Sequence, residues 1–316
     1  MEKVLVITGQ TASGKTKISL QLAKALNGEI INGDAMQVYK GLDIITDKIK
    51  KVDMEDIPHH LFDIKDINDN YSVMEYQTNI RRLIKEITSR NKLPIIVGGT
   101  GLYIKAALYD YDFMEENVDN IKEVQEYNDK SNDELYDMLL KIDPDSCATI
   151  HKNNRKRIIR ALSIAKYSNQ TKSEIINKQK HQLVYDALVF TLTMDKDISI
   201  AKMDERIEEM FANGAIDEVR NNKTNSTASK AIGYKEISDY LNGKISLDEA
   251  KELMKIHTHQ YAKRQRTWQR NQMNSIFINS DDKALENILS IIKEKWNRWF
   301  HFIFIRIIQL FLLVLF

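Results

Sequence analysis

The sequence predicts an α/β fold in which a parallel β-sheet forms the core and a helical domain is inserted into it. Short apolar runs without polar alternation are separated by longer segments of helical period, which is typical of a sheet covered by helices on both faces. The expected strands are residues 4–8, 29–32, 94–97 and 187–194, and the expected helices are residues 15–26, 73–90, 199–222 and 246–273. A glycine-free charged segment lies between the third and fourth strands.

The composition limits the classes of protein to which the chain can belong. Its 316 residues contain 46 Lys and Arg against 45 Asp and Glu, which excludes a uniformly basic nucleic-acid coat but not a local basic patch. Three prolines and 43% hydrophobic residues are typical of a globular protein. A single cysteine, Cys147, excludes an intramolecular disulfide framework and a multi-cysteine zinc site. Since the N-terminus lacks a secretory signal pattern, we expect a reduced, cytoplasmic protein.

A phosphate-binding loop joins the first expected strand to the first expected helix. Gly9-Gln10-Thr11-Ala12-Ser13-Gly14-Lys15-Thr16 has the pattern G-x-x-x-x-G-K-T of a P-loop, in the strand–loop–helix context that the motif requires. Its backbone N–H groups and the helix N-terminus favour an anion, Lys15 brings a mobile positive charge, and Thr16 offers a hydroxyl to Mg²⁺. A chance glycine turn is the alternative. The core is therefore expected to be P-loop NTPase-like.

Two polar residues follow the second and third expected strands. Asp34 follows residues 29–32, and Thr100 follows residues 94–97 after two glycines. Because the carboxyl ends of parallel strands share one edge of the sheet, both are expected near the P-loop. Asp34 is a candidate general base or metal ligand, with a turn or capping residue as the alternative. No carboxylate follows the third strand, which argues against an enzyme that hydrolyses ATP or GTP.

The insertion, residues 110–186, has an acidic part and a basic part. Thirteen acidic residues lie between positions 110 and 145, whereas the nine basic residues between 151 and 181 face only Glu174. The pattern is helical throughout. The catalytic core is then expected to comprise residues 1–109 and 187–297.

Three further groups of polar residues are candidates for binding. Arg157 and Arg160 share a helix face, and both a phosphate-backbone contact and a solvated surface remain open for them. Arg206 follows the fourth strand and either reaches the anion site or forms a surface ion pair with Glu209. Residues 261–270 mix basic and aromatic side chains, which suits a nucleic acid or a cation–π-stacked helix face. For the adjacent His59 and His60, we expect a structural hydrogen-bonding role rather than a metal site.

Residues 298–316 form an atypical apolar tail. The tail is short for a membrane-spanning helix and carries His301, Arg306 and Gln309 near its centre. We expect an oligomer contact or an irregular chain end there rather than a membrane contact. The sequence implies no stable protein partner.

Seven segments, in order along residues 1–297, resemble the tRNA dimethylallyltransferases (tRNA isopentenyltransferases). The segments are GQTASGKT at 9–16, INGDAMQVYKGLDIIT at 31–46, HHLFDI at 59–64, VGGTGLYIKA at 97–106, NNRKRIIRAL at 153–162, AIGYKEI at 231–237 and QYAKRQRTWQR at 260–270. The resemblance implies transfer of a dimethylallyl group from dimethylallyl diphosphate to the exocyclic amine of the adenine next to the anticodon in tRNA. It also implies a P-loop that holds the diphosphate rather than one that hydrolyses ATP.

The resemblance also implies roles for individual residues. The implied catalytic residues are Asp34 as general base, Thr100, Lys15 and Arg206. The implied diphosphate-binding residues are Gly9, Gln10, Thr11, Ala12, Ser13, Gly14, Lys15 and Thr16, with Mg²⁺ at Thr16. The implied tRNA-binding residues are Asp34, Ala35, Met36 and Gln37 in the core and Lys156, Arg157, Ile158, Ile159 and Arg160 in the insertion.

The sequence departs from the family pattern in the P-loop and in the insertion. Gln10 stands where the family usually has Pro. The family usually carries an arginine early in the insertion, but no arginine occurs between Arg90 and Arg155, and Lys122 is the candidate substitute.

Three other functions remain as alternatives. A P-loop small-molecule kinase would turn over ATP and would not need the basic insertion. An adenylate isopentenyltransferase would share the core and modify free AMP. An RNA-binding module with a vestigial P-loop is disfavoured, because Lys15, Thr16 and Asp34 are intact.

Overall fold

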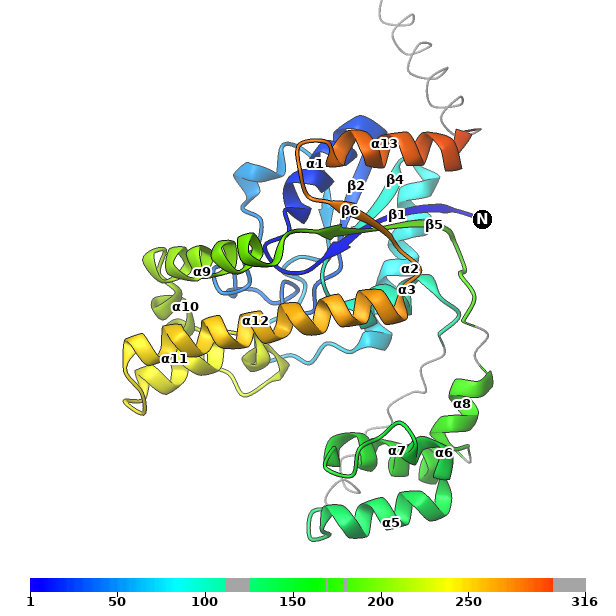
Figure 1. Cartoon of the computed structure of the whole chain (residues 1–316), viewed down its shortest axis with the longest axis vertical. Helices are drawn as coiled ribbons and strands as arrows, with labels where there is room; N and C mark the ends of the chain where they lie inside the picture. Colours follow the sequence, from blue (N-terminus) through cyan, green and yellow to red (C-terminus); the bar gives the residue numbers. More distant parts are fainter. Residues whose placement is uncertain (112–125, 169, 179–180, 298–316) are drawn as a thin grey trace, which may run out of the picture. The chain divides into compact units, whose positions relative to one another are not determined.

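The computed structural model describes residues 1–111, 126–168, 170–178 and 181–297. These residues form two compact units, one made of Met1–Leu108 with the chain from Val184 onward and the other made of Tyr109–Leu183 (Figure 1). The apolar tail expected at 298–316 and the candidate Lys122 lie outside the described residues.

A parallel β-sheet forms the centre of the larger unit. Within the described residues it has six strands in the order β3-β2-β4-β1-β5-β6, and every neighbouring pair is parallel. The strands are β1 (Lys3–Gly9), β2 (Gly28–Asn32), β3 (His59–His60), β4 (Leu93–Val97), β5 (Asp186–Thr193) and β6 (Ile276–Asn279). Val4, Leu5, Val6 and Ile7 of β1 are fully buried, as expected for a central strand covered on both faces. The predicted α/β fold is confirmed.

Helices cover both faces of this sheet. The helices of the larger unit are α1 (Lys15–Leu26), α2 (Val73–Ser89), α3 (Gly101–Leu108), α9 (Lys196–Ala212), α10 (Ala215–Asn221), α11 (Tyr234–Leu241), α12 (Leu247–Gln272) and α13 (Ala284–Lys295), with 3-10 turns η1 (Lys51–Met54) and η2 (Thr227–Lys230). Figure 1 shows α1 and α13 on one side of the sheet and α2, α3 and α12 on the other. Leu22, Phe190 and Ile288 join α1, β5 and α13 in one hydrophobic cluster.

The smaller unit is helical and has its own core. Its helices are α5 (Asn132–Ile142), α6 (Pro144–Cys147), α7 (Arg155–Ser168) and α8 (Lys172–Lys178). Leu135 and Leu139 of α5 pack with Ile158 and Leu162 of α7, and all four are at most 1% exposed. Ser131 begins α5 with a reciprocal capping box, which satisfies two backbone N–H groups at the helix start.

Several elements differ from the sequence prediction. The helix expected at 199–222 is two helices, because Gly214 adopts φ +98° and ends the path of α9. The short strands β3 and β6, and the helices α3, α11 and α13, were not predicted. β6 has only four residues and one buried position, so its sequence carries little strand signal. None of the helices in the described part of the chain combines the length and apolar character that a membrane crossing requires.

Candidate active site

The P-loop wraps from the end of β1 to the start of α1, and its backbone requires glycine at two places. Gly9 has φ +152°, and a Cβ there would lie 2.7 Å from Ser13 Oγ and 2.8 Å from the Leu192 carbonyl oxygen. Gly14 has φ +80° and begins α1 without a side-chain cap. The first N–H groups of α1 are therefore available to an anion, to which the helix dipole adds a favourable field.

Lys15 folds back onto the loop that carries it. Its Nζ donates hydrogen bonds to the carbonyl oxygens of Gly9 at 3.1 Å and Gln10 at 2.7 Å. Burial, and then the nearby Arg206 charge, lower the pKa of Lys15 to about 8, although Asp34 and Asp47 oppose the shift. The ammonium group is therefore charged at neutral pH but weakly solvated, which favours its transfer to a bound anion.

Arg206 brings a second cation to the same loop from α9. Its Nη1 donates to Thr11 Oγ1 at 3.0 Å and pairs with Asp47 Oδ2 at 3.1 Å. Burial lowers the pKa of this guanidinium, which nevertheless stays charged across the physiological range. Its Nε atom is buried and has no hydrogen-bond partner within the described residues. Arg206 therefore keeps donor capacity for a ligand, and its partner is Asp47 rather than the neighbouring Glu209 considered from the sequence.

Asp34 stands at the carboxyl end of β2 in a tight side-chain turn. Asn32 Oδ1 accepts a hydrogen bond from the Asp34 N–H at 2.8 Å, and Asp34 Oδ1 accepts one from the Met36 N–H at 2.8 Å. Thr100 Oγ1, at the end of β4, accepts a hydrogen bond from the Ala35 N–H at 3.1 Å. Asp34 is thus both a turn residue and a carboxylate directed at the edge of the sheet where the P-loop lies.

Three glycines around Thr100 allow other segments to approach this edge closely. A Cβ on Gly98 would lie 2.2 Å from the backbone of Gly33, and one on Gly99 would lie 2.1 Å from Gln265 Nε2. A Cβ on Gly101 would lie 2.1 Å from the Trp268 ring. The segment from Gly98 to Gly101 therefore packs directly against the loop after β2 and against α12.

One face of α12 holds the P-loop in place. Gln265 Oε1 accepts a hydrogen bond from the Thr11 N–H at 2.9 Å, and Gln265 Nε2 donates to the Gly99 carbonyl oxygen at 3.1 Å. Burial raises the pKa of the neighbouring Tyr261 to about 12, and its hydroxyl interacts with Thr100 and Gln265. Arg264 lies over the Tyr261 ring, 5.7 Å from its centroid.

Gln265, Tyr261 and Asp47 were not predicted individually as site residues. A signal existed for α12, since Tyr261, Gln265 and Gln269 recur every four residues and thus share one helix face. Residues 261–270 were instead considered for their mixture of basic and aromatic side chains. The structure assigns Gln265 and Gln269 to a buried face.

Two adjoining cavities share a wall at this site. A polar cavity of about 490 Å³ is lined by the P-loop, Asp47 and Gln37. A more apolar cavity of about 350 Å³ is lined by Met203, Met210 and Met254 among others. The residues that line both cavities are Thr11, Asp34, Thr46, Arg206 and Tyr261. A ligand with an anionic head and an apolar tail would extend from one cavity into the other and pass Asp34.

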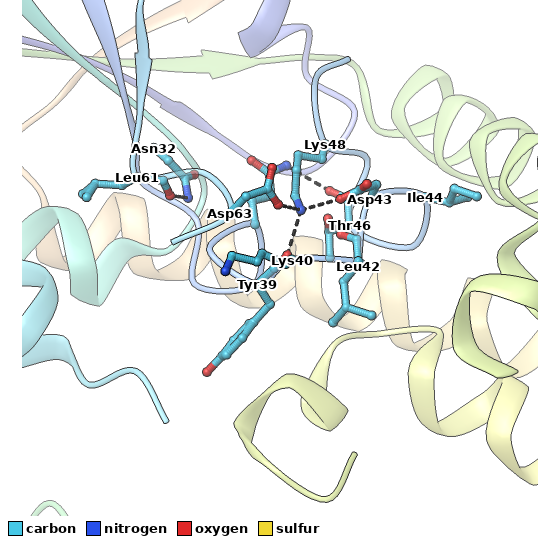
Figure 2. A network of polar contacts seen from close by, with 12 residues as sticks. Asn32, Tyr39, Lys40, Leu42, Asp43, Ile44, Thr46, Lys48, Leu61 and Asp63 are labelled. Atoms are coloured by element: carbon cyan, nitrogen blue, oxygen red, sulfur yellow. Dashed lines mark hydrogen bonds and ion pairs between the residues drawn. The ribbon is translucent and has the colours of Figure 1, made fainter. Parts of the chain in front are cut away.

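A buried lysine fixes the loop that follows β2. Lys48, whose side chain is 4% exposed, donates to the Tyr39 carbonyl oxygen at 2.8 Å and pairs with Asp43 and Asp63, each at 2.5 Å (Figure 2). The side chain of this lysine thus ties the loop after β2 to the segment that follows β3.

A carboxylate from α10 holds the same loop from outside. Glu218 accepts hydrogen bonds from the N–H groups of Asp43, Ile44 and Ile45, at 2.8, 2.7 and 3.0 Å. Gln37 Nε2 closes the loop by donating to the Thr46 carbonyl oxygen at 2.9 Å. These contacts fix the segment that carries Gln37 and Asp47 to the wall of the polar cavity.

The oxygen donors at the P-loop fit a divalent cation of the magnesium type. Thr16 is exposed at the start of α1, and its cavity is also lined by Asp34 and Asp47. Hydroxyl and carboxylate oxygens are the ligands that Mg²⁺ prefers. The described residues contain no cluster of three or more His, Cys, Asp or Glu side chains suited to holding a metal, so the protein would supply few ligands and a bound phosphate the others.

The adjacent histidines are structural, as predicted. His60 Nε2 lies 2.7 Å from Glu29 Oε2, and His59 Nδ1 lies 2.7 Å from the Ile57 carbonyl oxygen. The buried Glu29 also pairs with Arg90 at 2.7 Å.

In the smaller unit, the basic residues at the start of α7 are of two kinds, one structural and the others exposed. Arg155 donates to the carbonyl oxygens of Tyr127, Asn128 and Lys130 and so fastens the segment before α5. Lys156, Arg157 and Arg160 are exposed. Ile158 is fully buried, so its side chain is not available to an RNA, whereas Ile159 is partly buried against the same core.

Comparison with known proteins gives one consistent group of relatives. A family model described as IPP transferase matches residues 37–272. The chain is 48% identical over 306 residues to a tRNA dimethylallyltransferase of Anoxybacillus flavithermus, which covers 95% of this chain and 98% of that protein. It is 45% identical over 279 residues to a tRNA dimethylallyltransferase of Bacillus subtilis, which covers 86% of this chain and 89% of that protein.

Solved structures agree with these relatives. The tRNA delta(2)-isopentenylpyrophosphate transferase of Staphylococcus epidermidis superposes with a TM-score of 0.69 at 38% identity, over 94% of this chain and 99% of that one. A eukaryotic dimethylallyltransferase acting on tRNA superposes with a TM-score of 0.79 at 30% identity, over 94% of this chain and 77% of that one. The similarity therefore extends over nearly the whole chain.

Proposed function

The chain belongs to the IPP transferase family, and we propose that it transfers the dimethylallyl group of dimethylallyl diphosphate to the exocyclic amine of the adenine next to the anticodon in tRNA, with release of diphosphate. The activity is that of a prenyltransferase. An RNA substrate of this kind implies that the protein works in the cytoplasm.

The shared wall of the two cavities is the observation that carries this proposal. An allylic diphosphate has a multiply charged head and a five-carbon apolar tail. The P-loop cavity supplies N–H groups and two cations for the head, while the methionine-lined cavity supplies an apolar surface for the tail. A nucleoside triphosphate has no apolar tail to match the methionine-lined cavity, which disfavours the small-molecule kinase.

The residues at the shared wall suit the transfer reaction. The exocyclic amine of adenine is a weak nucleophile, because its lone pair is delocalised into the ring. Asp34 accepts the proton that the amine loses as its nitrogen bonds to the allylic carbon. As the bond from that carbon to the diphosphate oxygen breaks, Lys15, Arg206 and the N–H groups of the loop stabilise the charge on the leaving group.

Mg²⁺ is proposed as the cofactor, held at Thr16. When bound, the ion neutralises part of the diphosphate charge. The protein's share of this work is to present the Thr16 hydroxyl beside the first turn of α1, where the N–H groups already favour the same anion.

The acceptor RNA is proposed to contact the chain in two regions. Residues Asp34, Ala35, Met36 and Gln37 line the cavities and would meet the adenine. Enzymes that modify a base draw it out of its stack, so an adenine in an anticodon loop is an accessible target. The exposed Lys156, Arg157 and Arg160 would contact the RNA backbone.

A transfer assay tests the proposal and separates it from the alternatives. Purified protein with Mg²⁺ and labelled dimethylallyl diphosphate is given unmodified tRNA, AMP or ATP in parallel. We expect label in tRNA alone, entering about 10²-fold or more slowly with an Asp34→Asn variant. Label in AMP would assign the chain to the free-nucleotide class instead. ATP consumption without transfer would favour the kinase.

A further inference from the structure

Gln10 lies inside the P-loop but contacts two helices that are distant in sequence. Gln10 is only 2% exposed. The amide Nε2 donates a hydrogen bond to Ser199 Oγ on α9, and the amide Oε1 accepts one from Arg266 Nη1 on α12. Both ends of this buried amide therefore have a partner, each on a different helix.

The backbone of Gln10 contacts the first cation of the site. Its carbonyl oxygen accepts the 2.7 Å hydrogen bond from Lys15 Nζ. A rotation of the Gln10 peptide would therefore move the resting position of the Lys15 ammonium group.

The two helices held by Gln10 also carry the other groups that bind the loop. Ser199 and Arg206 are seven residues apart on α9, about two helical turns, and so lie on one face. Arg266 follows Gln265, which binds the Thr11 N–H. The position of Arg206 over the loop thus depends on how α9 is fixed near Ser199.

We propose that Gln10 is a positioning residue, which fixes α9 and α12 to the P-loop so that Lys15 and Arg206 converge on the diphosphate. The proposal rests on the proposed function only for the identity of the substrate. Convergence of the two cations requires only an anion in the P-loop. A loss of the Gln10 contacts should therefore weaken binding of the diphosphate itself, whereas a residue that only stabilises the fold would change the melting temperature alone.

The test measures binding of inorganic diphosphate with Mg²⁺ by calorimetry, together with the melting temperature. Gln10→Leu has a similar volume and no amide, and we expect about tenfold weaker binding, the scale of a lost hydrogen bond to a charged group. The matched control is Gln272→Leu. It removes an exposed amide at the end of α12, which accepts a hydrogen bond from Lys105 of α3. This variant should bind diphosphate as the unmodified protein does.

The outcomes separate this proposal from the proposed function. If the unmodified protein binds diphosphate but transfers no label, the proposed function fails and the Gln10 test still stands. A folded Gln10→Leu protein that binds diphosphate normally overturns the positioning role. If Gln10→Leu does not fold, Ser199→Ala provides the test. This small substitution on α9 removes one hydrogen-bond partner of the Gln10 amide. Weaker binding by this variant supports the proposal, and unchanged binding overturns it.

In the transfer assay, Gln10→Leu should raise KM for dimethylallyl diphosphate about tenfold with a smaller change in kcat, since the lost contacts act on bound substrate and transition state alike. A fall in kcat at unchanged KM would contradict the positioning role.

Discussion

The Arg206 guanidinium pairs with the Asp47 carboxylate at the edge of the P-loop cavity, with Nη1 and Oδ2 3.1 Å apart. Asp47 is 56% exposed and Arg206 only 24%, so the pair reaches from solvent into the site. A diphosphate that binds to Arg206 must share this cation with Asp47 and also approach the negative charge of Asp47. The ion pair therefore opposes anion binding.

Asp47→Asn should accordingly strengthen diphosphate binding. An ion pair with one exposed partner contributes about 0.2–1 kcal/mol, so KM for dimethylallyl diphosphate should fall by a factor of about 1.4 to 5. Asp66→Asn, which removes an exposed carboxylate paired with Lys40, is the control and should leave KM unchanged. A higher KM for Asp47→Asn would mean that Asp47 helps to hold Arg206 or a cation in place instead.

Two substitutions of Asp34 separate its turn role from a role as general base. Asp34→Ala should lower kcat by about 10²-fold or more, the usual scale for a positioned base. Asp34→Asn keeps an oxygen that can accept the 2.8 Å hydrogen bond from the Met36 N–H but is not basic. We expect both variants to lose the same activity while still binding tRNA and diphosphate. An active Asp34→Asn enzyme would show that only the turn matters.

The lowered pKa of Lys15 predicts a pH dependence of substrate binding. In the free protein Lys15 loses its proton as the pH rises through about 8, and a neutral amine does not attract diphosphate. The affinity for an unreactive analogue of dimethylallyl diphosphate should therefore fall above that pH, and binding there should take up a proton. The analogue's own phosphate titrates lower, at about 6.

The same shift has a consequence for stability with the opposite sign. Because the pKa is lowered on folding, keeping Lys15 charged destabilises the folded chain below pH 8, and this cost disappears as the pH rises toward the ordinary value of 10.5.

The binding prediction for Lys15 is tested by calorimetry. Titrations of the analogue in buffers of different ionisation enthalpy measure the proton uptake on binding. Lys15→Met should abolish it. An affinity that stays constant between about pH 7 and pH 9.5 would contradict the assignment.

The parts of the site that were predicted from sequence are local motifs. The P-loop, Asp34 and Thr100 each follow a strand within a few residues, so the rule that ligands bind at the carboxyl edge of a parallel sheet is enough to bring them together. Thr11 and Gln265 are 254 residues apart, and no local pattern predicts their contact. The same is true of Gln10, which was expected only as one residue of the diphosphate-binding loop and is buried between two helices.

Lys48 should stabilise the folded chain through its two ion pairs. Lys48→Met keeps the apolar stem in its buried position but leaves Asp43 and Asp63 without their common cation (Figure 2). Since both carboxylates are partly exposed, we expect a loss of about 1–3 kcal/mol in the free energy of unfolding, measured by urea denaturation. Lys40→Met, which removes a lysine 57% exposed and paired with Asp66, should change this free energy by less than about 0.5 kcal/mol. Equal effects of the two substitutions would mean that the network in Figure 2 adds no stability.

The exposed basic residues of α7 should set the salt dependence of tRNA binding. Arg157→Ala combined with Arg160→Ala should weaken tRNA binding. It should also reduce the slope of log affinity against log salt by about 1 to 2, because fewer phosphate contacts release fewer counterions on binding. Filter binding over a series of salt concentrations measures both quantities. Lys141→Ala, which removes an exposed lysine from α5 in the acidic part of the insertion, is the matched control and should leave the slope unchanged.

The melting temperature of the double variant checks that it folds. It should not change, since the core of this unit rests on Ile158 and Leu162 rather than on the two arginines. A weaker affinity with an unchanged slope would indicate that the arginines shape the unit without touching the phosphates, and an unchanged affinity would make this face an ordinary solvated surface.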